Sequence, residues 1–95
     1  MEENKVLLDQ SKISDFLKQN NNWSLKNDGV ECNLEFNNYM DSISFINKLA
    51  IKAEELNHHP DLIVGWCEVS VSFTSHDKGG VTSACLKMAK TVEEL

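Results

Sequence analysis

The residues best suited to chemistry lie between Glu54 and His76, a window that holds all three histidines and the one proline of this 95-residue chain. His58 and His59 are adjacent and directly precede Pro60, while His76 follows a stretch of alternating residues. Imidazole is the side chain whose ordinary pKa lies nearest neutral pH, so it can serve as acid, base or metal ligand. We therefore look for the functional site among these histidines.

Several roles are open to them. Histidines at a helix end commonly interact with its last carbonyl groups and its dipole. A metal site is disfavoured, because adjacent histidines seldom bind one ion and no fourth ligand is evident. Two or three imidazoles around one cleft suit general acid–base catalysis on a neutral organic substrate. If the helix continues to His58, Glu54 shares its face and would orient the ring. We expect His58 and His76 to reach solvent.

The charge and cysteine content narrow the possible partners and surroundings. The net charge is −6 and all nine basic residues are lysines, so the chain has no arginine fork for phosphate groups. An acidic balance opposes attraction to nucleic acid or anionic lipid, and no apolar run is long enough to span a membrane. Cys32, Cys67 and Cys85 show no CxxC spacing, and no secretory signal opens the chain. We expect a cytoplasmic protein with free, mostly buried thiols.

The elements that position the histidines follow from periodicity and turn chemistry. Asp9 is predicted to cap a first helix, and a hairpin follows over 23–26 and 30–36, with Asn27, Asp28 and Gly29 as its turn. Asp41 is predicted to cap a second helix that ends near Asn57 or His58, since Pro60 disfavours helical geometry before it. Two further strands, over 62–64 and 68–74, lead to a glycine loop and a last helix capped by Thr82.

Strict alternation predicts which side of each strand faces the core. Val69, Val71 and Phe73 should face the helices, as should Cys32, Leu34 and Phe36. The second helix presents one apolar stripe: Ile46, Leu49, Ala50, Ala53 and Leu56. The pattern predicts an α+β fold of one domain, residues 1–95, in which a four-stranded antiparallel sheet carries three helices on one face (α-β-β-α-β-β-α).

These residues resemble the pterin-4a-carbinolamine dehydratase family, also known as a dimerisation cofactor of a homeodomain transcription factor. The family pattern of an acidic residue, a His-His-Pro run, an aromatic residue and a third histidine is matched in type and spacing by Glu54, His58-His59-Pro60, Trp66 and His76. The resemblance covers nearly the whole chain, including Trp23, Phe36, Phe45 and Ser75-His76-Asp77.

The resemblance implies an enzyme that removes water from a 4a-hydroxytetrahydropterin and yields the quinonoid dihydropterin, in recycling of the tetrahydrobiopterin used by an aromatic amino-acid hydroxylase. His58 and His76 would transfer the protons, with Glu54 and His59 assisting. No metal or organic cofactor is required. A homodimer or homotetramer is implied, and a partner protein is possible. The pterin would contact Asn57, His58 and His59 on one side and Thr74, Ser75, His76 and Asp77 on the other.

One position departs from the family pattern: Cys85 stands where the family has an aspartate. The missing carboxylate could be catalytic, or it could have tied the start of the last helix to Thr82 in a capping box. A cysteine at a helix N-terminus can partly replace a negative charge. Two other functions therefore stay open: a catalytically weakened interaction module or coactivator-type protein of the same fold, and a pterin-binding accessory protein without turnover.

Overall fold

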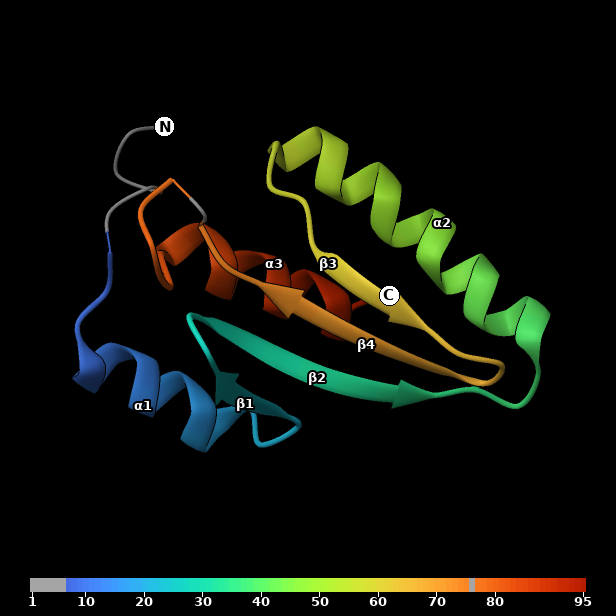
Figure 1. The fold of residues 1–95 in the computed structure, drawn as a ribbon, viewed down its shortest axis with the longest axis horizontal. Coiled ribbons are helices and arrows are strands. Elements are labelled where there is room, and N and C mark those ends of the chain that lie inside the picture. Colours follow the sequence, from blue (N-terminus) through green and yellow to red (C-terminus); the bar gives the residue numbers. More distant parts are fainter. Residues whose placement is uncertain (1–6, 76) are drawn as a thin grey trace.

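The computed structural model describes residues 7–75 and 77–95, and its helices and strands follow the predicted order (Figure 1). The fold class predicted from the sequence is confirmed. The elements are α1 (Gln10–Gln19), β1 (Trp23–Lys26), β2 (Gly29–Glu35), α2 (Tyr39–Leu56), β3 (Asp61–Val64), β4 (Glu68–Phe73) and α3 (Ser83–Glu93).

The four strands form one antiparallel sheet in the order β1-β2-β4-β3. The predicted hairpin joins β1 to β2, with Asn27 in the left-handed region at φ 55°. In the central pair of strands, Cys32 lies opposite Val71 and Val30 lies opposite Phe73. Because partners across a ladder point to the same face, this register directs the apolar residues of both strands to one side.

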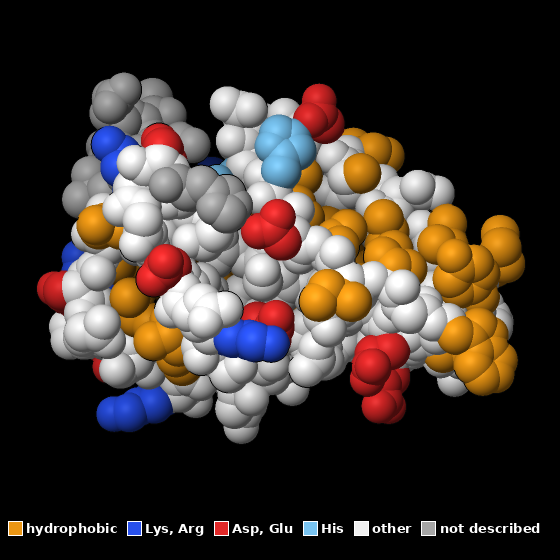
Figure 2. Space-filling model, in the orientation of Figure 1, with side chains coloured by type: hydrophobic (Ala, Val, Ile, Leu, Met, Phe, Trp, Pro, Cys, Tyr) orange, Lys and Arg blue, Asp and Glu red, His pale blue; other side chains and the backbone are white. Residues whose placement is uncertain are grey.

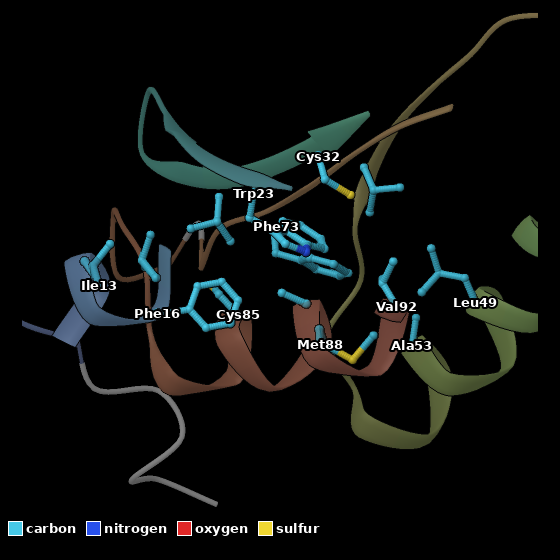
Figure 3. Packing of buried hydrophobic residues seen from close by; sticks show 14 of the residues in the cluster. Ile13, Phe16, Trp23, Cys32, Leu49, Ala53, Phe73, Cys85, Met88 and Val92 are labelled. Carbon is cyan, nitrogen blue, oxygen red and sulfur yellow. The ribbon is translucent and has the colours of Figure 1, made fainter. Parts of the chain in front are cut away.

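All three helices lie on that side of the sheet, and the core fills the layer between them (Figure 3). Val69, Val71 and Phe73 are fully buried, as predicted. Cys32 is buried too, while Leu34 and Phe36 are partly buried against the core. The other buried hydrophobic residues are Ile13, Phe16, Trp23, Val30, Leu49, Ala53, Val81, Cys85, Met88, Ala89 and Val92.

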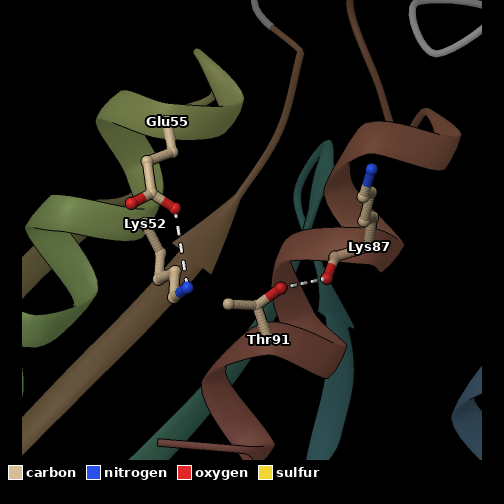
Figure 4. Close-up of polar contacts among 4 residues, drawn as sticks. All are labelled: Lys52, Glu55, Lys87 and Thr91. Carbon is tan, nitrogen blue, oxygen red and sulfur yellow. Dashed lines mark hydrogen bonds and ion pairs between the residues drawn. The ribbon is translucent and has the colours of Figure 1, made fainter.

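The apolar stripe of α2 is narrower than predicted. Leu49 and Ala53 are buried, whereas Ala50 and Leu56 are exposed. The opposite face carries an exposed pair, in which Lys52 Nζ lies 3.5 Å from Glu55 Oε1 (Figure 4). The same view shows the Thr91 hydroxyl of α3 donating to the Lys87 carbonyl at 2.9 Å (Figure 4).

The helix starts agree with prediction at α1 and α3 but not at α2. Asp9 accepts a hydrogen bond from the Lys12 N–H at 3.0 Å, and Thr82 is the N-cap of α3. The prediction that Asp41 caps α2 is wrong, because Asn38 holds that position and accepts from the Asp41 N–H at 2.8 Å. An asparagine side chain caps as well as an aspartate does, so the helix begins three residues earlier than predicted.

Candidate active site

The end of α2 decides where the adjacent histidines lie. Asn57 is in the left-handed conformation, with φ 51° and ψ 45°. The His58 N–H donates to the Ala53 carbonyl at 3.1 Å, and the Asn57 N–H donates to the Glu54 carbonyl at 3.3 Å. This pair of backbone bonds is a Schellman motif. Because backbone N–H groups already cap these carbonyls, the imidazoles are not needed as helix caps there.

His58 turns inward from this helix end. Only 6% of its surface is exposed, and its ring stacks on Phe73 with centroids 6.0 Å apart and planes inclined by 19°. Its Nε2 lies 3.4 Å from Cys85 Sγ. The prediction that His58 reaches solvent is therefore wrong. The left-handed residue before it redirects the chain, so His58 joins the core instead of continuing along the helix surface.

His59 turns outward and contacts the carboxylate of Glu54, with both side chains largely exposed. We predicted that Glu54 would orient His58, but the structure pairs it with His59. The helix ends at Leu56, so the spacing of four residues no longer places position 58 on the face of Glu54. The pair borders a hollow of about 180 Å³ between α2 and β3, whose other walls are mostly apolar: Ile46, Leu49, Ala50, Ala53, Pro60 and Leu62.

The predicted substrate-binding residues after β4 separate into two environments. Ser75 is buried, and its hydroxyl lies 2.7 Å from Thr82 Oγ1 and 3.6 Å from Cys85 Sγ. Thr74 points elsewhere and donates to the Asp28 carbonyl at 2.6 Å. Asp77 is exposed, and His76 lies outside the described residues. Ser75 and His58 therefore both contact the sulfur of Cys85. Thr74 instead lines a separate hollow of about 270 Å³ beside the hairpin turn.

Cys85 is the residue of the candidate site whose role the sequence predicts least clearly. Its sulfur accepts from the Thr82 N–H at 3.5 Å, as a capping-box residue does, and it also contacts the imidazole of His58. The Thr-x-x-Cys spacing signals the first contact, but no local pattern signals the second, which joins residues 27 apart in the chain. The contact with the Thr82 N–H is the one expected if Cys85 caps the helix, and the contact with His58 is the one expected if Cys85 belongs to the candidate site.

The other two cysteines and the two tryptophans differ in burial. Cys32 and Trp23 are buried in the core, Cys67 is partly buried, and Trp66 lies at the surface. Burial, followed by the charges of Glu93 and Glu31, raises the pKa of the Cys32 thiol to about 12. Trp23 is buried, and its indole N–H donates to Glu93 at 3.3 Å. Trp66 is 79% exposed. Among residues 7–75 and 77–95, no group of three His, Cys, Asp or Glu side chains is arranged to hold a metal ion.

The sequence profile of the family described as pterin 4 alpha carbinolamine dehydratase matches residues 6–95. The chain belongs to this family. Relatives that carry the name of this dehydratase family include one from Sulfurisphaera tokodaii, 34% identical over 93% of this chain and 95% of its own length. Another, from Trichodesmium erythraeum, is 36% identical over 94% of this chain and 96% of its own length. The resemblance inferred from the histidine pattern is confirmed at the level of the family.

Solved structures of other pterin dehydratase-like proteins share the fold. A transcriptional coactivator/pterin dehydratase from Brucella melitensis matches with a TM-score of 0.89 over 94% of this chain and 97% of its own, at 24% identity. A pterin dehydratase-like RuBisCO assembly factor of the alpha-carboxysome matches with a TM-score of 0.62 over 76% of this chain and 83% of its own, at 22% identity. In the part of the present chain that the structure describes, none of the helices is long and apolar enough to cross a bilayer.

Proposed function

We propose that this protein is a dehydratase that removes water from a 4a-hydroxytetrahydropterin. The observation that carries the proposal is the break at Asn57, which turns His58 inward to Cys85 and His59 outward to Glu54. The break thus places a buried imidazole in contact with a thiol and an exposed imidazole in contact with a carboxylate at one helix end, and histidine is the side chain used most often in general acid–base catalysis. Membership of the dehydratase family supplies the substrate class.

The reaction breaks the bond between carbon 4a and its hydroxyl oxygen. The hydroxyl takes up a proton and leaves as water, and the adjacent ring nitrogen loses a proton, so the product is the quinonoid dihydropterin. We assign the proton transfers to His58 and His76, with His59 and Glu54 assisting. Each direct acid or base of this kind contributes on the order of 10²- to 10⁴-fold. The proposed pterin contacts are Asn57, His58, His59, Thr74, Ser75, His76 and Asp77.

The decisive experiment measures the dehydration rate of a synthetic 4a-hydroxytetrahydropterin with and without the protein. We expect a rate well above the uncatalysed one. Pterin binding without acceleration would instead identify an accessory binding protein. If neither binding nor acceleration is found, an interaction module of the same fold is the better description.

The carboxylate beside His59 gives a sharper prediction. Replacing Glu54 by glutamine keeps its shape but removes its charge, and we expect turnover to fall by about two- to five-fold, the effect of one exposed ion pair. The free energy of unfolding should change by less than about 0.5 kcal/mol, because the side chain is on the surface. Glu55→Gln is the matched control, since Glu55 pairs with Lys52 away from the histidines. Equal turnover in the two variants would remove Glu54 from the mechanism.

We also propose that the protein assembles with copies of itself through β3 and the outer face of α2. β3 is an edge strand, and an open edge with apolar side chains is a surface that proteins usually cover. Figure 2 shows hydrophobic side chains gathered over the α2 side of the molecule. The exposed apolar residues of these two elements and the turn after β3 are Tyr39, Met40, Ile51, Leu56, Ile63, Val64 and Trp66.

Light scattering should therefore report a dimer or larger assembly at micromolar concentration. Introducing a charge with Ile63→Lys should shift the protein toward the monomer, because the charge would be buried at the contact. Leu25→Lys, on the opposite edge strand, is the control and should keep the assembly. A monomeric wild-type protein would contradict the proposal.

A further inference from the structure

The side chain of Cys85 lies at the centre of a buried polar cluster that also contains His58, Ser75 and Thr82. From its place at the start of α3, its sulfur lies 3.4 Å from His58 Nε2, 3.6 Å from Ser75 Oγ and 3.7 Å from Thr82 Oγ1. The Thr82 N–H points at the same sulfur from 3.5 Å. One thiol thus connects the end of α2, the end of β4 and the start of α3.

We infer that Cys85 is a positioning residue, whose thiol donates its proton to Nε2 of His58 and holds the neutral imidazole with its proton on Nδ1. The inference rests on the proposed function and deepens it, because it states which ring nitrogen of His58 donates a hydrogen bond and which accepts one. The tautomer itself is a property of the folded protein and can be measured without a substrate.

The direction of the thiol proton follows from the donors in the cluster. A backbone N–H can only donate, so the sulfur accepts from Thr82. The hydroxyls of Ser75 and Thr82 are 2.7 Å apart, so one of them donates to the other. The remaining hydroxyl proton has the sulfur as its neighbour within the cluster. Of the atoms that could accept the proton of the thiol, Nε2 of His58 is the nearest, at 3.4 Å against 3.6 and 3.7 Å for the hydroxyl oxygens of Ser75 and Thr82, so we assign the thiol proton to that nitrogen.

The tautomer matters because the two ring nitrogens have opposite hydrogen-bonding roles in a neutral imidazole. When Nε2 accepts from Cys85, Nδ1 carries the N–H and the ring offers a donor at that edge. The stacking of the ring on Phe73 restricts the orientation of its plane and so holds Nε2 beside the sulfur of Cys85. A donor edge can hydrogen-bond to the oxygen of the departing hydroxyl and hold it in place.

The test reads the tautomer directly, by long-range ¹H–¹⁵N NMR correlations of the His58 ring in the labelled full-length protein at a pH where the ring is neutral. We expect the proton on Nδ1 in the wild type and in Cys85→Ser, whose hydroxyl can also donate. Cys85→Asp places a carboxylate that can only accept, so the proton should move to Nε2. The control is Cys32→Ala, a buried cysteine of β2 outside the cluster, which should leave the His58 signals unchanged.

A wild-type ring with its proton on Nε2, or identical His58 signals in the wild type and Cys85→Asp, would overturn the inference. If Cys85→Asp does not fold, Cys85→Ser and Cys85→Ala decide: the serine variant should keep the wild-type tautomer, and the alanine variant should lose it. Turnover should fall by about 10-fold or more in Cys85→Ala and less in Cys85→Ser. If the wild type shows no turnover, the proposed function fails while the NMR result still decides the role of Cys85.

Discussion

Replacing His58 by alanine is expected to lower dehydration turnover by on the order of 10²-fold or more. The reason is the loss of one of the two imidazoles that we propose transfer protons, the other being His76. His76→Ala should have an effect of similar size. The double variant should lose less than the product of the two, since groups that act as one unit are not additive. Single-turnover kinetics of the three variants would measure both effects.

The buried position of His58 makes a control for stability necessary. His58→Ala removes a ring stacked on Phe73 and a partner of Cys85, so we expect it to cost about 1–3 kcal/mol of unfolding free energy. His58→Phe retains an aromatic ring at the stack and should recover part of that loss, but none of the turnover. If His58→Phe were as active as the wild type, or if His76→Ala had no effect on turnover, the assignment of these histidines would be wrong.

Phe73→Ala should cost about 3–5 kcal/mol of unfolding free energy, the largest loss of stability that we predict. Phe73 is fully buried, and its ring lies 6.1 Å from that of Trp23 and 6.0 Å from that of His58. Removing it leaves a cavity between the sheet and α3 and takes away the surface on which His58 rests. Urea unfolding monitored by tryptophan fluorescence would measure the loss.

Leu25→Ala is the matched control for this substitution. Leu25 also lies in a strand, outside the proposed interface, and 46% of its surface is exposed, so its truncation should change the unfolding free energy by less than about 0.5 kcal/mol. A loss below roughly 1 kcal/mol for Phe73→Ala would mean that its face of β4 is not the core face. Turnover of Phe73→Ala should also fall, because the imidazole would no longer be held in one orientation.

Most of the fold could be predicted because it depends on local patterns. The alternation from Val69 to Phe73 specifies a buried face, and Asn27-Asp28-Gly29 specifies a hairpin turn. The start of α2 was misplaced, because Asn38 and Asp41 are both good capping residues and only the folded chain shows which side chain reaches which N–H. Local capping rules rank such candidates but do not always separate them.

The site was less predictable than the fold because its contacts join distant segments. The motif drew attention to His58, but its burial depends on one left-handed residue, Asn57, and on the position of Phe73 in another element. The contact between Cys85 and His58 exists only once α3 is packed against the end of α2. Spacing along the chain therefore predicts which residues are candidates for the site but not which side chains they contact.

The left-handed turn at Asn57 also limits how the length of this segment can vary. The first residue after Asn57 faces the core and the second faces solvent. A one-residue deletion directly after Asn57 would therefore move His59 into the place of His58 and bring Pro60 to the surface position beside Glu54. A one-residue insertion before His58 would put His58 at that outer position and leave a new side chain against Phe73 and Cys85. Homologous chains that share this site should therefore align across the turn without gaps, even where the hairpin loop between β1 and β2 differs in length.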